Sequence, residues 1–395
     1  MQFADRMSPL QSNVFADIDR AKAKLRQSGA EVIDLSLGSS DLPTSPHLLD
    51  AIAQSLGNPT THGYLLFNGT RSFRETAARW YEQRFGIAVN PETEVLPLIG
   101  SQEGTAHIPL AVLNPGDYAL LLDPGYPSHS GGVYLAGGQI YPMPITASNQ
   151  FLPEFDRIPA DVLDRARLMV LSYPHNPTGA IATFDFFKTA VTFCQQHGLV
   201  LVHDFPYLDL VYGSEPAPSI LQADPGKSCS IEFFTLSKSY NMGGFRVGYA
   251  IGNANLITAL RQIKATVDFN QYLGILNAAS LALSGSQATV EKTIQTFKTR
   301  LELFTQRLNA IGWTVECPQA AMYVWAKIPD CAQAKYGNHS MKFCLDLMEQ
   351  TGVIASPGVG FGAAGEGYVR FALVYEPEIL NVAIDRIGKF LKSIA

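Results

Sequence analysis

The decisive stretch of this chain reads Thr235-Leu236-Ser237-Lys238-Ser239-Tyr240-Asn241-Met242-Gly243-Gly244-Phe245-Arg246-Val247-Gly248-Tyr249. Lys238 follows an apolar run, and Arg246 follows Lys238 among hydroxyl groups and glycines. A lysine amine bonds to a carbonyl carbon when its surroundings disfavour the ammonium form, whereas arginine keeps its charge and grips phosphate with a planar fork of donors. The pair indicates a covalently held phosphate cofactor. Taken alone, the stretch would be better explained by a surface lysine and an arginine near a glycine-rich turn.

Polar side chains also follow the ends of other strand-like runs. The runs end before Asp123-Pro124-Gly125-Tyr126-Pro127, before Pro174-His175-Asn176-Pro177-Thr178-Gly179, before Asp204 and before Lys238. These runs alternate with helical patterns, which predicts an α/β fold with a mostly parallel central sheet flanked by helices. Ligands of such sheets bind beyond the carboxyl ends of the strands, so we expect the four segments to deliver side chains to one site.

Length and periodicity predict two domains. The chain has 395 residues, of which 47% are hydrophobic, and this exceeds the usual size of one core. We expect an N-terminal segment, residues 1–44, that packs with the small domain and carries a helix over 14–27. A large domain would span 45–284 and a small α+β domain 285–395. Apolar residues at helical spacing over 294–311, ending at a glycine, mark the start of the small domain.

Composition excludes several classes of protein. A net charge of −6 without a basic cluster argues against nucleic-acid binding. The five cysteines are scattered, which predicts neither a disulfide framework nor a metal site and fits a reducing cytoplasm. We find no signal peptide and no apolar run of membrane-spanning length. The segment 358–363 matches the dinucleotide fingerprint Gly-x-Gly-x-x-Gly/Ala, but no helix pattern follows it.

The remaining candidates match the ring of pyridoxal 5'-phosphate (PLP). Its pyridine nitrogen stays protonated only beside a carboxylate, and Asp204 is the candidate, with Asp209 as the alternative. Asp204 could also simply cap a turn. Asn176 and Tyr207 are of the right type to donate to the phenolic oxygen, although both also suit turns. Tyr126 could stack on the ring or be part of ordinary packing.

Two further segments provide anion-binding groups. Ser101 and Gln102 precede an apolar helical stretch whose free N–H groups could bind a phosphate, with Ser101 as both N-cap and ligand. Glu103 in the same turn would repel a phosphate, so its carboxylate must point away. Arg370 lies in an apolar strand, where an unpaired charge is costly. It could grip a substrate carboxylate or form an internal salt bridge.

With these residues in place, the chain resembles the class I/II aminotransferases of PLP fold type I over nearly its whole length. The similarity rests on Ser237-Lys238 with Arg246, on 176–179, on Asp204 with Tyr207, on 123–127 and on the strand around Arg370. The N-terminal stretch 6–19 is similar to the aspartate and LL-diaminopimelate branch. Phe205 and Pro206 depart from the family's common pattern, and so does Gln102, where a lysine is common.

The resemblance implies a role for each candidate. Lys238 would form the Schiff base and shuttle protons, Asp204 would partner the pyridine nitrogen, Asn176 and Tyr207 would donate to the phenolate, and Arg370 would clamp the carboxylate. Ser101, Gln102, Thr235, Ser237 and Arg246 would meet the phosphate, with Tyr64 reaching across from the second subunit of a homodimer. Gly38 would form a substrate-side backbone turn.

The resemblance also implies the reaction, a ping-pong transfer of an amino group between an L-amino acid and a 2-oxo acid, with LL-diaminopimelate or aspartate-type substrates ranked first. Alanine- or glutamate-type aminotransferases remain open. So does a PLP-dependent carbon–sulfur lyase, which would use the same Lys238 and Asp204 to eliminate a β-substituent. An aminotransferase-like regulator is a third alternative, but we find no room before Leu35 for a DNA-binding segment.

Overall fold

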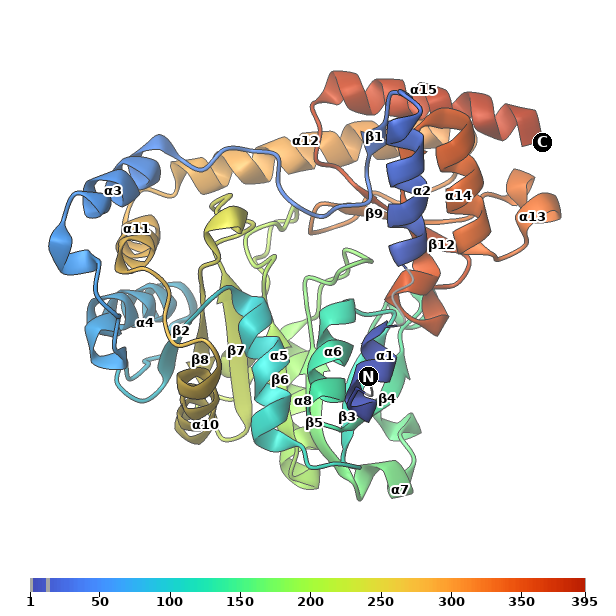
Figure 1. The fold of residues 1–395 in the computed structure, drawn as a ribbon. Helices are drawn as coiled ribbons and strands as arrows, with labels where there is room; N and C mark the ends of the chain where they lie inside the picture. Colours follow the sequence, from blue (N-terminus) through green and yellow to red (C-terminus); the bar gives the residue numbers. More distant parts are fainter. Residues whose placement is uncertain (1–2, 12–14, 395) are drawn as a thin grey trace.

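The computed structural model describes residues 3–11 and 15–394. Its centre is a seven-stranded sheet with the strand order β2-β8-β7-β6-β5-β3-β4, in which β8 alone runs antiparallel to its neighbours (Figure 1). The strands are β2 (Val95–Leu98), β3 (Tyr118–Asp123), β4 (Gln139–Pro144), β5 (Ala166–Leu171), β6 (Val200–Asp204), β7 (Ser230–Thr235) and β8 (Gly248–Gly252). The mostly parallel sheet confirms the predicted fold class.

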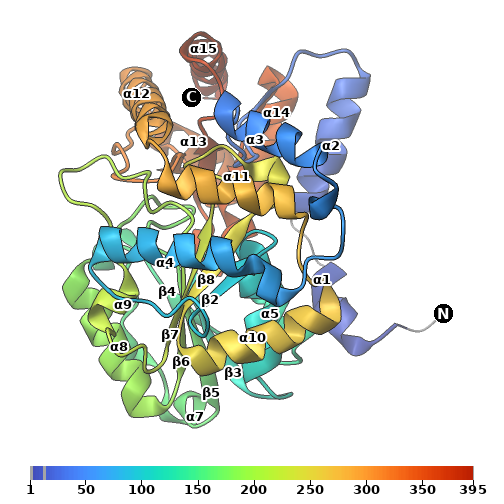
Figure 2. The same cartoon turned by 90° about the vertical axis from the view of Figure 1, so that its left-hand side faces the viewer.

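Helices cover both faces of this sheet (Figure 2). The neighbours Phe233 and Phe234 on β7 show why, because alternate residues of a strand point to opposite faces and both rings are buried, in two different cores. The helices of this part are α3 (Pro46–Leu56), α4 (Arg71–Phe85), α5 (Ser101–Val112), α6 (Pro127–Leu135), α7 (Ala160–Leu163), α8 (Phe184–His197), α9 (Ile220–Ala223), α10 (Ala254–Val267) and α11 (Leu273–Ser284). A sheet covered on both sides reads as continuous apolar runs, as observed.

A second, smaller layer of strands and helices lies beyond the carboxyl ends of the large sheet (Figure 1). Its strands are β9 (Tyr323–Lys327), β11 (Ser356–Pro357) and β12 (Tyr368–Ala372) in one antiparallel sheet, with β1 (Ile33–Asp34) parallel to β10 (Val353–Ile354). Its helices are α2 (Phe15–Gln27), α12 (Ala288–Ala310), α13 (Asp330–Tyr336), α14 (Ser340–Thr351) and α15 (Pro377–Ile394). These elements share a separate apolar core around Trp313 and Phe343.

The N-terminal segment that carries α2 and β1 joins the C-terminal part of the chain in this layer. The pairing of β1 with β10 and the packing of α2 against α14 bring the N-terminal segment onto the small C-terminal part. The first described residues behave differently, because α1 (Ser8–Gln11) packs against α6 of the large part. The expected helix over 14–27 is observed from Phe15, and Val14 lies outside the described residues. The domain boundaries at residues 45 and 285 stay a prediction.

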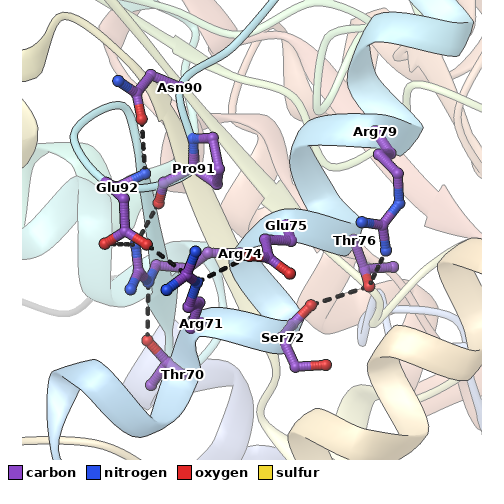
Figure 3. Close-up of polar contacts among 10 residues, drawn as sticks. All are labelled: Thr70, Arg71, Ser72, Arg74, Glu75, Thr76, Arg79, Asn90, Pro91 and Glu92. Atoms are coloured by element: carbon purple, nitrogen blue, oxygen red, sulfur yellow. Dashed lines mark hydrogen bonds and ion pairs between the residues drawn. The ribbon is translucent and has the colours of Figure 1, made fainter.

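The polar contacts of α4 show how the chain enters the large sheet (Figure 3). Arg74 is buried, and its guanidinium donates to the hydroxyl of Thr70, the carbonyl of Pro91 and the carboxylate of Glu92, 3.1 Å away. These contacts fix the loop that precedes β2. No helix within residues 3–11 and 15–394 has the length and apolarity needed to cross a bilayer.

Candidate functional site

A cavity of about 660 Å³ lies where the large sheet faces the small part. Polar residues from the ends of β3, β5, β6 and β7 line it, as expected for an open α/β sheet. The predicted site residues in its wall are Gly38, Ser101, Gln102, Tyr126, Asn176, Asp204, Tyr207, Thr235, Ser237, Lys238, Arg246 and Arg370. Tyr64 lies outside this wall, and its side chain is 95% exposed.

Asp204 is the last residue of β6, and its side chain is buried. The carboxylate oxygen Oδ2 lies 3.0 Å from Nε2 of His129 on α6. The other oxygen, Oδ1, has no hydrogen-bond partner among the described residues. A buried acceptor without a donor is costly, so this oxygen suits a ligand N–H. The alternative carboxylate, Asp209, is paired with Arg84 at 2.6 Å and does not line the cavity.

His129 is a site residue that the sequence analysis missed. It stands three positions after Tyr126, in the first turn of α6, and its ring packs edge-on against Tyr126. One signal in the sequence could have found it, because residues three apart on a helix lie on the same face, and His129 follows the candidate Tyr126 at this spacing. The contact between the imidazole and Oδ2 fixes the orientation of this buried carboxylate.

Lys238 follows β7 and points across the cavity. Its Nζ donates to the carbonyl oxygen of Gly38 at 2.5 Å, and it lies 5.7 Å from the ring centroid of Tyr207. The amine therefore meets the backbone of a segment 200 positions earlier in the chain. A Cβ atom at position 38 would lie only 2.1 Å from the hydroxyl oxygen of Tyr323, so the backbone can approach Tyr323 this closely only because residue 38 is glycine.

The start of α5 and the loop after β7 form the polar end of the cavity. Gly100, with φ 77°, is the N-cap of α5, and Ser101 is its first helical residue. The expectation that Ser101 is the N-cap is therefore wrong. The reason is the positive φ of Gly100, which glycine adopts without strain, so the chain turns at residue 100 and Ser101 is already helical. The hydroxyl of Thr235 donates to the hydroxyl of Ser237 at 2.8 Å. The free N–H groups of α5, these hydroxyls and the guanidinium of Arg246 therefore line one end of the cavity, where they could bind a phosphate.

Glu103 turns away from this polar end. Its carboxylate accepts hydrogen bonds from Nζ of Lys264, 2.9 Å from each oxygen, and from the N–H of Ile99 at 2.5 Å. The residue is buried and does not line the cavity. The sequence predicts that Glu103 would repel a phosphate. In the structure, its carboxylate points away from the cavity and forms an ion pair with Lys264.

Arg370 reaches the cavity from β12 and is buried. It donates to the amide oxygen of Asn176 at 2.9 Å, to the carbonyl of Ser36 at 2.6 Å and to the hydroxyl of Ser356 at 3.3 Å. Its guanidinium lies 4.6 Å from the ring centroid of Phe361. No ion pair within residues 3–11 and 15–394 involves Arg370, so the alternative of an internal salt bridge is not found, and this cation faces the cavity uncompensated by a carboxylate.

Tyr207 and Tyr323 join the two walls of the cavity. Their hydroxyl oxygens lie 2.6 Å apart, with Tyr207 in the large part and Tyr323 on β9 of the small part. Burial raises the pKa of Tyr207 well above its ordinary value, so its hydroxyl stays protonated and able to donate. Tyr323 was missed because the sequence gives its strand but not the distant residue that its hydroxyl meets.

Comparisons with known proteins agree on one family. A sequence profile described as "Aminotransferase class I and II" matches residues 30–387. The chain is 40% identical to LL-diaminopimelate aminotransferase 2 of Trichormus variabilis over 98% of both chains, and 40% identical to the LL-diaminopimelate aminotransferase of Moorella thermoacetica over 100% of both.

Solved structures show the same similarity. A probable N-succinyldiaminopimelate aminotransferase from Thermus thermophilus is 40% identical, with a TM-score of 0.89 over 95% of this chain and 99% of that one. Substrate-bound BacF from Bacillus subtilis is 34% identical, with a TM-score of 0.93 over 99% of this chain and 98% of that one.

Proposed function

The chain belongs to the class I and II aminotransferases, and from this premise we propose that it binds PLP in the 660 Å³ cavity and transfers the amino group of LL-diaminopimelate to a 2-oxo acid. One observation carries the proposal. The amine of Lys238, the carboxylate of Asp204 and the guanidinium of Arg370 come from distant segments and line the same cavity.

The donors and acceptors of the cavity fit the three polar ends of PLP. The unpartnered Oδ1 of Asp204 suits the protonated pyridine nitrogen, the turn at Ser101 with Arg246 suits the phosphate, and Lys238 suits the aldehyde. Tyr207 would hold the phenolic oxygen. When bound, PLP supplies an electron sink for the bond that breaks at the substrate α-carbon.

The side chains of the chain then have separable tasks. Nζ of Lys238 would take the α-proton of the substrate and deliver it to the cofactor instead of returning it to the α-carbon. Oδ1 of Asp204 would accept a hydrogen bond from the protonated pyridine nitrogen, and His129 orients the carboxylate of Asp204. Arg370 binds the substrate α-carboxylate with two parallel hydrogen bonds and so fixes the α-carbon relative to Lys238.

The covalent role of Lys238 can be tested directly. The purified protein loaded with PLP is reduced with borohydride, digested and analysed by mass spectrometry. We expect the mass of the reduced cofactor on the peptide that contains Lys238. An unmodified Lys238, or the added mass on another lysine, would contradict the proposal.

The proposed substrate rests on the relatives at 40% identity that are named LL-diaminopimelate aminotransferases. A panel of amino donors with 2-oxoglutarate as acceptor tests it, read as relative kcat/KM. We expect LL-diaminopimelate to exceed aspartate and alanine by at least about tenfold, the lower end of what a difference in side-chain contacts provides. Glutamate is left out of the panel, because its transfer to 2-oxoglutarate regenerates the same two compounds. Equal values would refute this substrate, and pyruvate released from cystathionine without an acceptor would indicate a carbon–sulfur lyase instead.

We also propose a homodimer in which Tyr64 reaches the phosphate site of the partner. Tyr64 is 95% exposed, and Leu56 and Leu66, which lie before and after it in the sequence, are also exposed, which favours a protein partner. The amide of Asn270 holds the adjoining backbone at Leu65 with a 3.0 Å hydrogen bond. Analytical ultracentrifugation of the active protein tests the dimer, which a fully active monomer would exclude.

A further inference from the structure

A buried group of charges lies behind the polar end of the cavity, between α5 and α10, which run side by side in Figures 1 and 2. Lys264 on α10 is fully buried. Its Nζ lies 2.9 Å from each carboxylate oxygen of Glu103 and 3.4 Å from a carboxylate oxygen of Asp268. Desolvating an ammonium group is expensive, and hydrophobic side chains of similar volume would often serve stability as well. Stability alone therefore does not explain the ion pair between Lys264 and Glu103.

Glu103 connects this group of charges to the wall of the cavity. Its carboxylate accepts the N–H of Ile99 at 2.5 Å, and Ile99 is followed by the N-cap Gly100 and by Ser101 in the cavity wall. This contact holds the turn that aims the first N–H groups of α5. The same carboxylate carries a negative charge within one helical turn of the anion that these groups would bind, which opposes binding.

Lys264 supplies the compensating charge. Burial is the largest influence on Glu103 and raises its pKa, while Lys264 acts in the opposite direction. Glu103, His107 and Asp268 place ligand atoms within 4.8 Å of one another, which by type could suit a metal ion. The ammonium group of Lys264 bonds to two of these three residues, so a built-in cation already stands in this group.

We propose that Lys264 is a positioning residue for the cofactor phosphate. It neutralises Glu103, so Glu103 can hold Ile99 and the start of α5 in place without repelling the phosphate. The proposal rests on the proposed function, since it presumes that the polar end of the cavity binds the phosphate of PLP.

The test compares two cofactors that differ only in the phosphate. Dissociation constants of PLP and of pyridoxal, which lacks the phosphate, are measured by equilibrium dialysis for the wild type and for Lys264→Met. We expect the variant to bind PLP at least about tenfold more weakly, because a buried carboxylate beside the phosphate loses its counter-charge, and to bind pyridoxal as the wild type does. Equal weakening of both cofactors, or unchanged PLP binding, would overturn the proposal.

A double variant separates charge from packing. Glu103→Gln with Lys264→Met removes both charges, while the amide oxygen of Gln can still accept the N–H of Ile99. We expect its PLP affinity to return to within about threefold of the wild type, since the group then carries the same net charge as in the wild type, with Asp268 unchanged. Persistently weak PLP binding in this variant would overturn the proposal, and the double variant remains decisive even if Lys264→Met does not fold.

Arg74→Met provides the matched control. Arg74 is also a buried cation, paired with Glu92, but its contacts hold the loop before β2 and not the start of α5 (Figure 3). Thermal unfolding should show a loss of stability in this variant with an unchanged ratio of PLP to pyridoxal affinity. A changed ratio in Arg74→Met would mean that any lost buried pair perturbs the phosphate site and would overturn a specific role for Lys264. Failure of the wild type to bind PLP would instead refute the proposed function.

Discussion

The two walls of the cavity are built in different ways. The large-domain wall is the side of the cavity that the large sheet and its loops form. There, His129 contacts Asp204, and the carbonyl of Gly243 accepts a hydrogen bond from Arg246, so each partner comes from the same part of the chain. On the small-domain wall, Arg370 reaches across to Asn176, and Tyr323 meets a hydroxyl of the large part. The first wall can keep its geometry alone, whereas the second depends on how the two parts sit together.

This difference matches the proposed division of work. A cofactor that stays bound needs a fixed cradle, and side chains braced inside one rigid sheet provide it. A substrate that enters and leaves in every cycle needs contacts that can form and release, and bonds between two parts of a chain can respond to its arrival. Variants of the two walls should therefore affect different measured quantities.

The largest effect is expected at Lys238, where the two walls meet through its bond to Gly38. Lys238→Ala removes both the covalent attachment and the proton carrier, so we expect kcat to fall by at least about 10⁴-fold. Stopped-flow measurement of a single turnover checks this, with thermal unfolding as the control for folding. A variant with near-normal rates would end the proposed mechanism.

A smaller, more selective effect is expected at Arg370. Arg370→Lys keeps the charge but loses the planar fork that matches a carboxylate, so kcat/KM should fall about 100-fold. The dissociation constant of PLP should stay unchanged, because this residue belongs to the small-domain wall. Steady-state kinetics and equilibrium dialysis check the two halves of the prediction. Weaker PLP binding would break the comparison, since the walls would then not act separately.

The residues that sequence reasoning could find share one property. Asp204 is the last residue of a strand, Asn176 and Lys238 follow the ends of two others, and parallel strands bring such positions to one edge whatever their separation along the chain. The runs of apolar residues were sufficient to predict the parallel sheet. The antiparallel strand β8 and its neighbour β2 were not predicted, because their pairing depends on register with distant strands.

The residues that were missed share the opposite property. His129, Tyr323 and Lys264 act through partners at least 75 positions away in the sequence, and a hydrogen bond between distant side chains leaves no local periodicity. The case of Glu103 is instructive, because the sequence exposed the problem of a carboxylate beside a phosphate site. The sequence could not show that Lys264 on α10 forms the ion pair that compensates the charge of Glu103.

Tyr323→Phe tests the bond that joins the two walls. The change removes one buried hydroxyl and leaves Tyr207 without its partner, so we expect a loss of about 1 kcal/mol in the free energy of unfolding. The expected fall in kcat/KM is less than about tenfold, because Tyr207 keeps its own hydroxyl. Urea unfolding and steady-state kinetics measure both. A fall as large as that of Arg370→Lys would show that the bridge, and not Arg370, governs the small-domain wall.

The smallest effect concerns the support behind Arg370. Burial alone would raise the pKa of Asp34, but hydrogen bonds from Lys22 and Ser36 outweigh burial and lower it. Since the folded pKa lies below the unfolded value of about 4, this carboxylate stabilises the fold above that pH. Its contribution is lost as the pH falls through the folded pKa. The ion pair with Lys22 spans 2.8 Å but is partly exposed, so we expect less than about 1 kcal/mol.

Urea unfolding of Asp34→Asn at pH 7 and at about pH 3.5 measures this contribution, with the exposed Asp17 as the site of a matched Asp17→Asn control. We expect the difference from the wild type to be present at pH 7 and smaller at the acidic pH. The carbonyl of Ser36 holds Arg370, so Asp34→Asn should also raise the KM of the amino donor and leave PLP affinity intact. A change in PLP affinity without a change in KM would contradict the prediction, because it would mean that Asp34 supports the cofactor site and not Arg370.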